Sequence, residues 1–356
     1  MSKKIVITGG AGFVGSSLAI YLKTTYSSYQ IYALDNLKRK GAHLNLHRLA
    51  DNGVIFVHGD IRNKEDFESF PQDIDFVIEA SAEPSILAGM DGTPDYLINT
   101  NLVGTINCLN FAKKCKAGFI FLSTSRVYPI KKIEEIAYIE QNTRFALANK
   151  QQLPGISSLG INENFPLDGY RSLYGATKLA SELLIQEYNH FYNLPTVINR
   201  CGVLTGPWQM GKVDQGVVVL WMAKHFWKQK LAYLGYEGTG KQVRDVLHIA
   251  DLLQLIDYQL HNFHLINGEI FNVGGGEQVS VSLLELTGFA QAITGNKIPV
   301  DQVKENRQAD IRIYITDHSK VTKVTGWQPQ YTVEQIVEDI YNWIKDYKHQ
   351  LETVLK

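Results

Sequence analysis

Residues 8–15 of the chain read Thr-Gly-Gly-Ala-Gly-Phe-Val-Gly and follow directly on the apolar run Ile5–Ile7. Three glycines recur at a spacing of three residues: Gly9, Gly12 and Gly15. The first permits a tight turn, the second lets the backbone approach a pyrophosphate, and the third lets a helix pack closely on the sheet. Because such a triplet alone also fits a plain turn, its context between a predicted strand and a predicted helix is what favours a dinucleotide site.

Two further features support this interpretation of the turn. The first helical amides, at Phe13 and Val14, carry partial positive charge that attracts phosphate. Asp35 ends the second apolar run about twenty residues later, where a carboxylate accepts hydrogen bonds from ribose hydroxyls and repels a 2'-phosphate. The sequence therefore favours NAD over NADP. The basic run 38–40, Lys-Arg-Lys, could instead neutralise such a phosphate, or form a solvated surface.

Short apolar runs alternate with segments of helical period over residues 1–200, which predicts a parallel sheet wound by helices. The predicted strands are 4–8, 30–35, 54–57, 75–80, 117–123 and 195–200. We expect an α/β fold with a Rossmann-type doubly wound parallel sheet, helices on both faces, and a smaller mixed α/β substrate lobe. The cofactor domain is predicted at 1–200 with 245–277 returning to it, with a substrate-side insertion at about 129–171. Segments 201–244 and 278–356 are predicted to form the substrate lobe.

Composition narrows the class of protein. The chain has 356 residues, a formal net charge of -1 and 45% hydrophobic content, which argues against nucleic acid and acidic membranes as partners. The three cysteines, Cys108, Cys115 and Cys201, are odd in number and lack metal-ligand spacing, so reduced thiols are expected, with neither disulfides nor a bound metal. No signal-peptide or membrane-spanning apolar stretch is evident, which predicts a cytoplasmic protein.

Tyr174 and Lys178 are four residues apart in a run read as a helix, a spacing that places a phenol beside an ammonium group. A free phenol has a pKa of about 10, and a nearby cation lowers it towards the neutral range that a base needs. The pair therefore predicts a tyrosine base, although two such residues also fit an exposed amphipathic helix.

With these features, the chain resembles the extended short-chain dehydrogenase/reductases of the sugar-nucleotide epimerase and dehydratase type. The resemblance covers nearly the whole chain. Beyond the glycine turn and the Tyr174–Lys178 pair, it rests on 35–37 (Asp-Asn-Leu), 58–62 (His-Gly-Asp-Ile-Arg), 101–105 (Asn-Leu-Val-Gly-Thr), 123–128 (Ser-Thr-Ser-Arg-Val-Tyr), 242–248 (Gln-Val-Arg-Asp-Val-Leu-His) and 271–275 (Phe-Asn-Val-Gly-Gly).

This resemblance implies roles for individual residues. Tyr174 would take the proton of a sugar hydroxyl as hydride leaves the carbon, Lys178 would hold the nicotinamide ribose, and Thr124 would orient the same sugar oxygen. NAD would bind at Gly9, Gly12, Phe13, Val14, Gly15, Asp35, Asn36, Arg39, Asp60, Ile61, Ala80, Asn101, Tyr174 and Lys178. The nucleotide-sugar substrate would bind at Thr124, Arg126, Gln209, Gln215, Arg244 and Arg307, with the two last arginines on the diphosphate. Asp214 is a further candidate, in the segment 206–216 that could form a wall for the sugar or base. His248 is expected to be a packed structural histidine.

Two residues distinguish the reactions within this family. The dehydratases place an Asp and a Glu after the catalytic threonine, whereas this chain has Ser125 and Arg126. A hydroxyl and a guanidinium cannot act as that acid and base, so epimerisation is favoured over dehydration.

A narrower resemblance is to the epimerases that act at C2 of a CDP-linked dideoxyhexose. The segments that carry it are 35–42 with Asn45 and Leu46, 56–63, 143–145, 214–216 and 240–248. Two alternatives stay open. One is epimerisation of another nucleotide sugar at C4, or a related oxidoreductase, and the other is an NAD-binding regulatory scaffold without catalysis. Relatives of this type lead us to expect a homodimer or homotetramer.

Overall fold

The computed structural model describes residues 2–89, 92–211 and 215–356 of the chain. These residues form two compact units, which are described separately. Unit 1 comprises Met1–Val127, Leu173–Arg200 and Leu252–Ile270. Unit 2 comprises Tyr128–Ser172, Cys201–Asp251 and Phe271–Lys356. The functional division into a cofactor domain and a substrate lobe stays a prediction.

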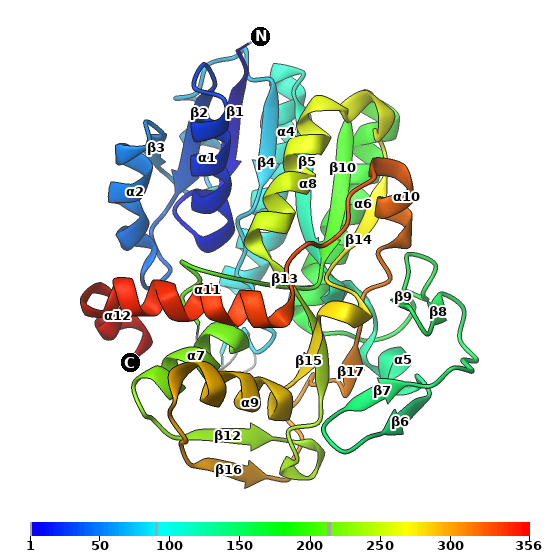
Figure 1. Ribbon diagram of the computed structural model, residues 1–356. Coiled ribbons are helices and arrows are strands. Elements are labelled where there is room, and N and C mark those ends of the chain that lie inside the picture. The colour runs from blue at the N-terminus through cyan, green and yellow to red at the C-terminus, as the bar shows by residue number, and fades with distance from the viewer. Residues whose placement is uncertain (1, 90–91, 212–214) are drawn as a thin grey trace. The chain divides into compact units, whose positions relative to one another are not determined.

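A seven-stranded sheet, built mainly by unit 1, has the order β14-β10-β5-β4-β1-β2-β3 (Figure 1). Its strands are β1 (Lys4–Thr8), β2 (Gln30–Asp35), β3 (Ile55–His58), β4 (Phe76–Glu79), β5 (Gly118–Thr124), β10 (Thr196–Cys201) and β14 (Ile270–Val273). The pairs β1–β2, β2–β3, β1–β4 and β4–β5 are all parallel. The predicted doubly wound parallel sheet is thus confirmed, with strand limits within one or two residues of those predicted.

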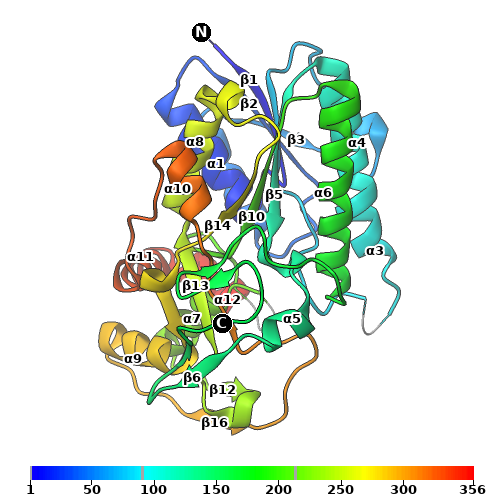
Figure 2. The ribbon, with the colours of Figure 1, turned by 90° about the vertical axis from the view of Figure 1, so that its right-hand side faces the viewer.

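Helices cover both faces of this sheet, α1 and α8 on one side and α4 and α6 on the other (Figure 2). The helices of this part of the chain are α1 (Phe13–Thr25), α2 (Asn45–Asp51), α3 (Asp95–Ile98), α4 (Gly104–Cys115), α6 (Leu173–Tyr192) and α8 (Ile249–His261). Strands with both faces covered are largely apolar, and all seven residues of β5 are buried. On the α4 and α6 side, a core cluster joins Phe111 of α4, Phe121 of β5 and Ile185 of α6.

Unit 2 is a mixed α/β assembly. In its four-stranded sheet, β13 (Val243–His248) pairs with β11 (Val203–Thr205), β15 (Ser280–Ser282) and β17 (Ile313–Tyr314). β12 (Leu231–Leu234) and β16 (Val300–Val303) form a separate parallel pair. Helices α7 (Val217–Phe226), α9 (Leu283–Thr294) and α11 (Val333–Asp346) pack against one another, and α10 (Ser319–Thr325) and α12 (Lys348–Leu355) complete the unit.

The predicted insertion at about 129–171 contains short regular elements. They are α5 (Ile130–Glu134), the antiparallel pair β6 (Tyr138–Glu140) and β7 (Phe145–Leu147), and the antiparallel pair β8 (Ile156–Ser157) and β9 (Gly160–Ile161). Strands of two or three residues are too short to show a period of two, which is why the sequence did not reveal them. Among the described residues, no helix has the length and apolarity needed to cross a membrane.

Candidate functional site

The glycine turn joins β1 to α1 in a conformation that side chains would block. Gly9 has a φ of 67°, in the left-handed region, and a Cβ there would lie 2.9 Å from the carbonyl oxygen of Ala80. A Cβ on Gly15 would overlap the carbonyl oxygen of Gly9. Gly12 precedes α1, no side chain of the described residues caps the helix, and its first turn holds no acidic residue. The positive end of α1, at Phe13 and Val14, is therefore suited to an anionic group.

Asp35 ties the end of β2 to this turn. Its Oδ2 atom accepts a hydrogen bond from the backbone N–H of Ala11 at 3.0 Å, and its Oδ1 atom accepts one from Leu37 at 2.7 Å. Burial raises the pKa of the Asp35 carboxyl, and the backbone hydrogen bonds from Leu37, Ala11 and Gly12 oppose that effect. Each carboxylate oxygen has a second lone pair, so Asp35 can hold the turn and still accept from a ribose hydroxyl.

Asn36 and Asp60 form a hydrogen-bonded cluster beside Asp35. The Asn36 amide donates to Asp60 at 2.8 Å, and the Arg62 guanidinium donates to both oxygens of Asp60, at 3.0 and 2.6 Å. Burial alone would raise the pKa of Asp60, but the hydrogen bonds from Arg62 and Asn36 outweigh it and lower the pKa to about 2. Asp60 therefore stays ionised and holds the loop after β3 in place.

The other predicted cofactor residues of this region are placed as follows. Ile61 is buried in the core cluster, with its side chain against Gly104 of α4. Ala80 follows β4 and donates its N–H to the carbonyl of Thr8, beside the glycine turn. Arg39 lies half-buried in the loop after β2.

Tyr174 and Lys178 lie one turn apart near the start of α6. Lys178 is 1% exposed, and its Nζ atom lies 3.8 Å from the centre of the Phe121 ring on β5. Tyr174 is half-buried. A buried ammonium is costly unless other groups stabilise it, so this pair is no stripe of a solvated amphipathic helix. The geometry instead brings a fixed positive charge to within one helical turn of a phenol.

Thr124 is the last residue of β5 and is 6% exposed. Its Oγ1 atom accepts a hydrogen bond from the backbone N–H of Arg126 at 3.2 Å. Because that oxygen is used as an acceptor, its own hydrogen is directed elsewhere and can be donated to a bound oxygen. Ser125 and Arg126 form a short 3₁₀ turn, Ser125–Val127, after the strand, and this turn packs against α6.

Asn101 lies in a π-helical turn, Asn99–Val103, that leads into α4. Its side-chain amide bonds both the N–H and the carbonyl of Glu83, at 2.8 and 3.0 Å. Its main-chain carbonyl accepts hydrogen bonds from the hydroxyl groups of Thr105 and of Ser181 on α6. Asn101 thereby fixes the start of α4 against α6, the helix that carries Tyr174.

A buried ion pair supports the same helix, and the sequence did not single it out. Glu182, one turn after Lys178, accepts from Arg200 of β10 at 2.7 Å and from the hydroxyl of Ser123 at 2.5 Å. Ser123 immediately precedes Thr124. The network therefore fixes α6 relative to the end of β5. The only sequence signal for this ion pair was an acidic residue four positions after Lys178. That spacing of opposite charges is common on helices, so it did not distinguish Glu182.

In unit 2 the two predicted phosphate-binding arginines meet at one carboxylate. Arg244 donates to Asp310 at 3.0 Å and to the carbonyl of Ile311 at 2.7 Å. Arg307 lies 3.9 Å from the other oxygen of Asp310. The ion pair of Arg244 is thus with Asp310. Two guanidinium groups and one carboxylate leave a net positive charge here, which attracts an anion.

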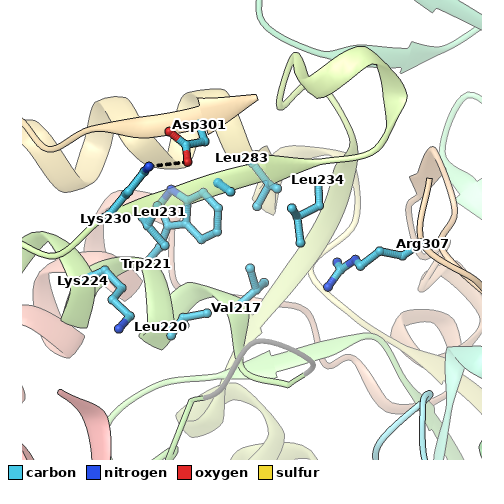
Figure 3. A pocket seen from close by; sticks show the side chains of 11 residues that line it. Val217, Leu220, Trp221, Lys224, Lys230, Leu231, Leu234, Leu283, Asp301 and Arg307 are labelled. Atoms are coloured by element: carbon cyan, nitrogen blue, oxygen red, sulfur yellow. Dashed lines mark ion pairs between the residues drawn. The ribbon is translucent and has the colours of Figure 1, made fainter. Parts of the chain in front are cut away.

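A pocket of about 340 Å³ lies beside Arg307 (Figure 3). Its lining residues are Val217, Leu220, Trp221, Lys224, Lys230, Leu231, Ala232, Leu234, Leu283, Asp301 and Arg307. The guanidinium of Arg307 extends towards the space between Leu234 and Val217. Thr287 accepts a hydrogen bond from the Trp221 indole at 2.9 Å, which fixes the orientation of that ring. The pocket suits a flat, partly apolar group that carries an anion at one end.

The remaining predicted substrate residues have mixed surroundings. The Gln209 amide is engaged locally, with Leu204 at 2.8 Å and Thr205 at 3.0 Å. Gln215 is half-buried just before α7, and Asp214 lies outside the described residues. His248 packs on the ring of Tyr331 with a centroid distance of 4.1 Å, and burial lowers its pKa to about 4. That packing agrees with the structural role expected for His248.

The residues of unit 1 fit a dinucleotide. The glycine turn leaves no room for side chains, no side chain of the described residues caps the start of α1, and the Asp35 carboxylate lies at the turn. No group of three or more His, Cys, Asp or Glu side chains in the described parts of the chain is arranged to hold a metal ion.

Comparisons with known proteins agree with this geometry. The model of the NAD dependent epimerase/dehydratase family matches residues 5–274. CDP-paratose 2-epimerase of Salmonella typhi is 32% identical over 96% of this chain and 98% of that protein. A putative UDP-glucose 4-epimerase of Methanocaldococcus jannaschii is 28% identical over 96% of this chain and 98% of its own.

Among solved structures, UDP-glucuronic acid 4-epimerase from Bacillus cereus, in complex with UDP-glucuronic acid and NAD, has a TM-score of 0.79. It is 25% identical and covers 96% of this chain and 99% of its own. The chain therefore belongs to the NAD dependent epimerase/dehydratase family of extended short-chain dehydrogenase/reductases, as an isomerase-type enzyme whose cofactor is NAD.

Proposed function

We propose that this enzyme epimerises a nucleotide-diphosphate sugar by transient oxidation of one ring carbon and reduction from the opposite face. The observation that carries the proposal is the buried ammonium of Lys178, one turn from Tyr174 on a helix packed against the strand that ends in Thr124. Bound NAD supplies the hydride acceptor and donor for this chemistry.

The proposed steps follow from the chemistry of the three side chains. Thr124 donates its hydroxyl hydrogen to the sugar oxygen and orients that oxygen towards Tyr174. Tyr174, as phenolate, takes the proton of the sugar hydroxyl when the carbon is oxidised and returns it when the carbon is reduced. Lys178 favours the phenolate by its charge and holds the nicotinamide ribose. The keto sugar must turn over between the two steps, since epimerisation requires that both faces be presented.

The residues after Thr124 support epimerisation over dehydration. Elimination of water across two ring carbons requires an acid and a base, and Ser125 and Arg126 offer neither a carboxyl group nor a carboxylate. Arg126 is instead proposed to contact the substrate through its guanidinium group.

For the nucleotide part of the substrate, we propose the pocket of unit 2. Trp221 and the leucines of the wall suit a base, and the paired guanidinium groups of Arg244 and Arg307 suit a diphosphate. Gln209 and Gln215 are proposed to contact the sugar or the base. Because Asp310 neutralises part of the positive field in the free enzyme, the diphosphate would compete with it for both arginines.

CDP-paratose, epimerised at C2 to CDP-tyvelose, is the substrate we propose. The support is the 32% identity with CDP-paratose 2-epimerase over nearly the whole chain. A UDP- or GDP-sugar 4-epimerase, or a related oxidoreductase, is the alternative, since a putative UDP-glucose 4-epimerase is 28% identical over a similar length.

The test is incubation of the NAD-loaded protein with CDP-paratose, followed by NMR. We expect inversion at C2, its loss in Tyr174→Phe, and its retention in Tyr170→Phe, a matched exposed tyrosine near the start of α6. Inversion of a UDP-sugar at C4 with CDP-paratose unchanged would reject the substrate and keep the class. Binding of NAD without any change in either sugar, in the native and the variant protein alike, would favour a regulatory scaffold.

Two further expectations belong to this proposal. We propose a homodimer or homotetramer in the cytoplasm, with a nucleotide sugar as its small-molecule partner. Sedimentation of the purified protein measures the assembly state directly, and a monomer at micromolar concentration would reject it.

A further inference from the structure

Glu79 is a buried carboxyl group for which the proposed reaction has no use. It is the last residue of β4 and is 0% exposed. A carboxylate is rarely buried without a partner, because its transfer out of water costs several kcal/mol. Its position therefore requires a physical reason.

The register of the sheet places Glu79 next to Phe121, the residue over whose ring the cation of the proposed catalytic pair lies. Glu79 is the parallel register partner of Phe121 on β5, so both side chains point to the same face of the sheet. The ammonium of Lys178 lies over that Phe121 ring, at 3.8 Å from its centre. The positive charge of Lys178 in turn lowers the pKa of Glu79.

Hydrogen bonds fix the carboxyl group but leave one side of it open. The hydroxyl of Thr105, on α4, donates to the Oε1 atom of Glu79 at 2.7 Å. The Oε2 atom has no hydrogen-bond partner among the described residues. An ionised carboxylate with an unsatisfied buried oxygen is destabilised. The charge of Lys178 makes the largest contribution to offsetting that cost, and hydrogen bonds from Thr105 and Cys108 make further contributions.

The ionisable groups that face Glu79 are Cys108 on α4 and Lys178 on α6. Its register partners on the neighbouring strands, Thr8 and Phe121, carry no charge. Burial raises the pKa of the Cys108 thiol well above its usual value, so this thiol stays neutral. Lys178 is therefore the charged side chain with which Glu79 interacts.

Burial raises the pKa of Glu79 to about 7, and Lys178, Thr105 and Cys108 act in the opposite direction. A proton on this carboxyl group is thus gained or lost within the working range of an enzyme. When Glu79 is neutral, the full charge of Lys178 acts on its surroundings. When Glu79 is ionised, part of that field is cancelled.

We propose that Glu79 is a positioning residue that acts through Lys178: by gaining or losing a proton, it sets how strongly the ammonium stabilises the phenolate of Tyr174. This inference rests on the proposed function for the roles of Tyr174 and Lys178. The electrostatic interaction between Glu79 and Lys178, in contrast, does not depend on any substrate.

The first experiment measures that interaction through the pH dependence of protein stability. A carboxyl whose pKa is raised on folding stabilises the folded state below its unfolded pKa, and this contribution is lost as pH rises through the folded pKa. The native protein should therefore lose stability relative to Glu79→Gln between about pH 4.5 and 7. In a Lys178→Met background the loss should extend to higher pH by roughly one unit, because the ammonium no longer favours the carboxylate.

Chemical denaturation at several pH values is measured for four proteins: native, Glu79→Gln, Lys178→Met and the double variant. The four stability curves show whether Glu79 and Lys178 interact. The inference would be overturned if the stability loss ended at the same pH in the Lys178→Met background. It would also be overturned if the difference in free energy of unfolding between the native protein and Glu79→Gln did not depend on pH. Lys178→Ala serves as a second background should Lys178→Met fold poorly. This result is independent of the substrate assignment.

The second experiment measures the effect on the reaction, with NAD-loaded protein and whichever nucleotide sugar it converts. Glutamine resembles the protonated carboxyl, so the rates of Glu79→Gln and native protein should stay in a fixed ratio at low pH. Above neutrality Glu79→Gln should become the faster, by about three- to tenfold, since no carboxylate weakens the field at Tyr174.

Ser181→Ala is the matched control, because Ser181 is buried on the same helix, bonds Asn101 and carries no charge. Its rate relative to native protein should not depend on pH. A pH-independent ratio for Glu79→Gln as well would reduce Glu79 to a packing residue. If no sugar is converted, the proposed function fails, while the stability experiment still tests the interaction between Glu79 and Lys178.

Discussion

Asp35 holds the glycine turn in shape and is also the residue predicted to bind the cofactor ribose. Its two oxygens hold the backbone of Ala11 in the glycine turn and of Leu37 after the strand. The sequence predicted its role as a ribose acceptor from its distance to the glycines alone. The structure adds that the same carboxylate keeps the turn in shape, so its loss should affect more than a ribose contact.

We expect Asp35→Ala to weaken NAD binding by roughly 10- to 100-fold, as for the loss of charge-assisted hydrogen bonds. NADP should be discriminated against less strongly, because the repulsive charge is gone. Calorimetric titration of both cofactors measures this, with Asp51→Ala, on an exposed helix end, as the control. Equal losses of NAD and NADP affinity would mean that Asp35 shapes the turn without selecting the cofactor.

At the scale of elements, the junctions at the ends of β1 and β5 determine the site. Between β1 and α1 the backbone approaches itself so closely that glycine is required. At the end of β5, Ser123, Glu182 and Arg200 fix strand and helix together one residue before Thr124. A helix or strand prediction states that these elements exist, whereas the site depends on how their ends are joined.

Gly15→Ala should destabilise the protein by about 1 to 3 kcal/mol, because its Cβ overlaps the carbonyl of Gly9 and forces the turn apart. NAD binding should be lost in the same variant. Gly288→Ala is the matched control, as a Cβ there meets nothing within 4 Å, and a helical alanine should stabilise the protein by up to ~1 kcal/mol. Denaturation and NAD titration of both variants measure this. Wild-type affinity in Gly15→Ala would show that the turn can widen without penalty.

Glu182→Ala should cost about 3 to 5 kcal/mol, since it leaves the buried guanidinium of Arg200 without its partner. Glu187→Ala, exposed on the same helix, should change stability by less than about 0.5 kcal/mol. Removal of both charges, by Glu182→Met with Arg200→Leu, should recover part of the loss. A Glu182→Ala variant as stable as Glu187→Ala would contradict a buried, unsolvated pair.

At the scale of the whole molecule, the two units contribute different parts of the proposed chemistry. Unit 1 holds the glycine turn, Thr124, Tyr174 and Lys178, whereas Arg244, Arg307 and the pocket belong to unit 2. We therefore expect substitutions in unit 2 to affect substrate binding far more than cofactor binding.

Arg307→Ala should raise the KM for the nucleotide sugar by about 10- to 100-fold, with kcat changed by only a few-fold, because a diphosphate contact is made in ground and transition states alike. NAD affinity should be unchanged. Steady-state kinetics against Lys304→Ala, an exposed lysine three residues earlier, measures this. A large fall in kcat with an unchanged KM would place Arg307 in the chemical step instead.

Much of this was accessible from the sequence because local rules determine it. The glycine spacing and the apolar runs predicted the turn, the parallel sheet and most strand limits, and the spacing of Tyr174 and Lys178 predicted their helical pair. The motifs and their order along the chain predicted the family. Short strands within 129–171 escaped prediction because two or three residues show no period.

Only the tertiary structure decided which charged groups, distant in the sequence, lie close enough to interact. The register of β4 on β5 placed Glu79 beside the Phe121 ring over which Lys178 lies, and the fold of unit 2 brought Arg244 and Arg307 to the carboxylate of Asp310. Sequence spacing encodes neighbours along a helix or strand. It does not encode the neighbours that strand register and burial create, and burial is what raises the pKa of Glu79 to about 7.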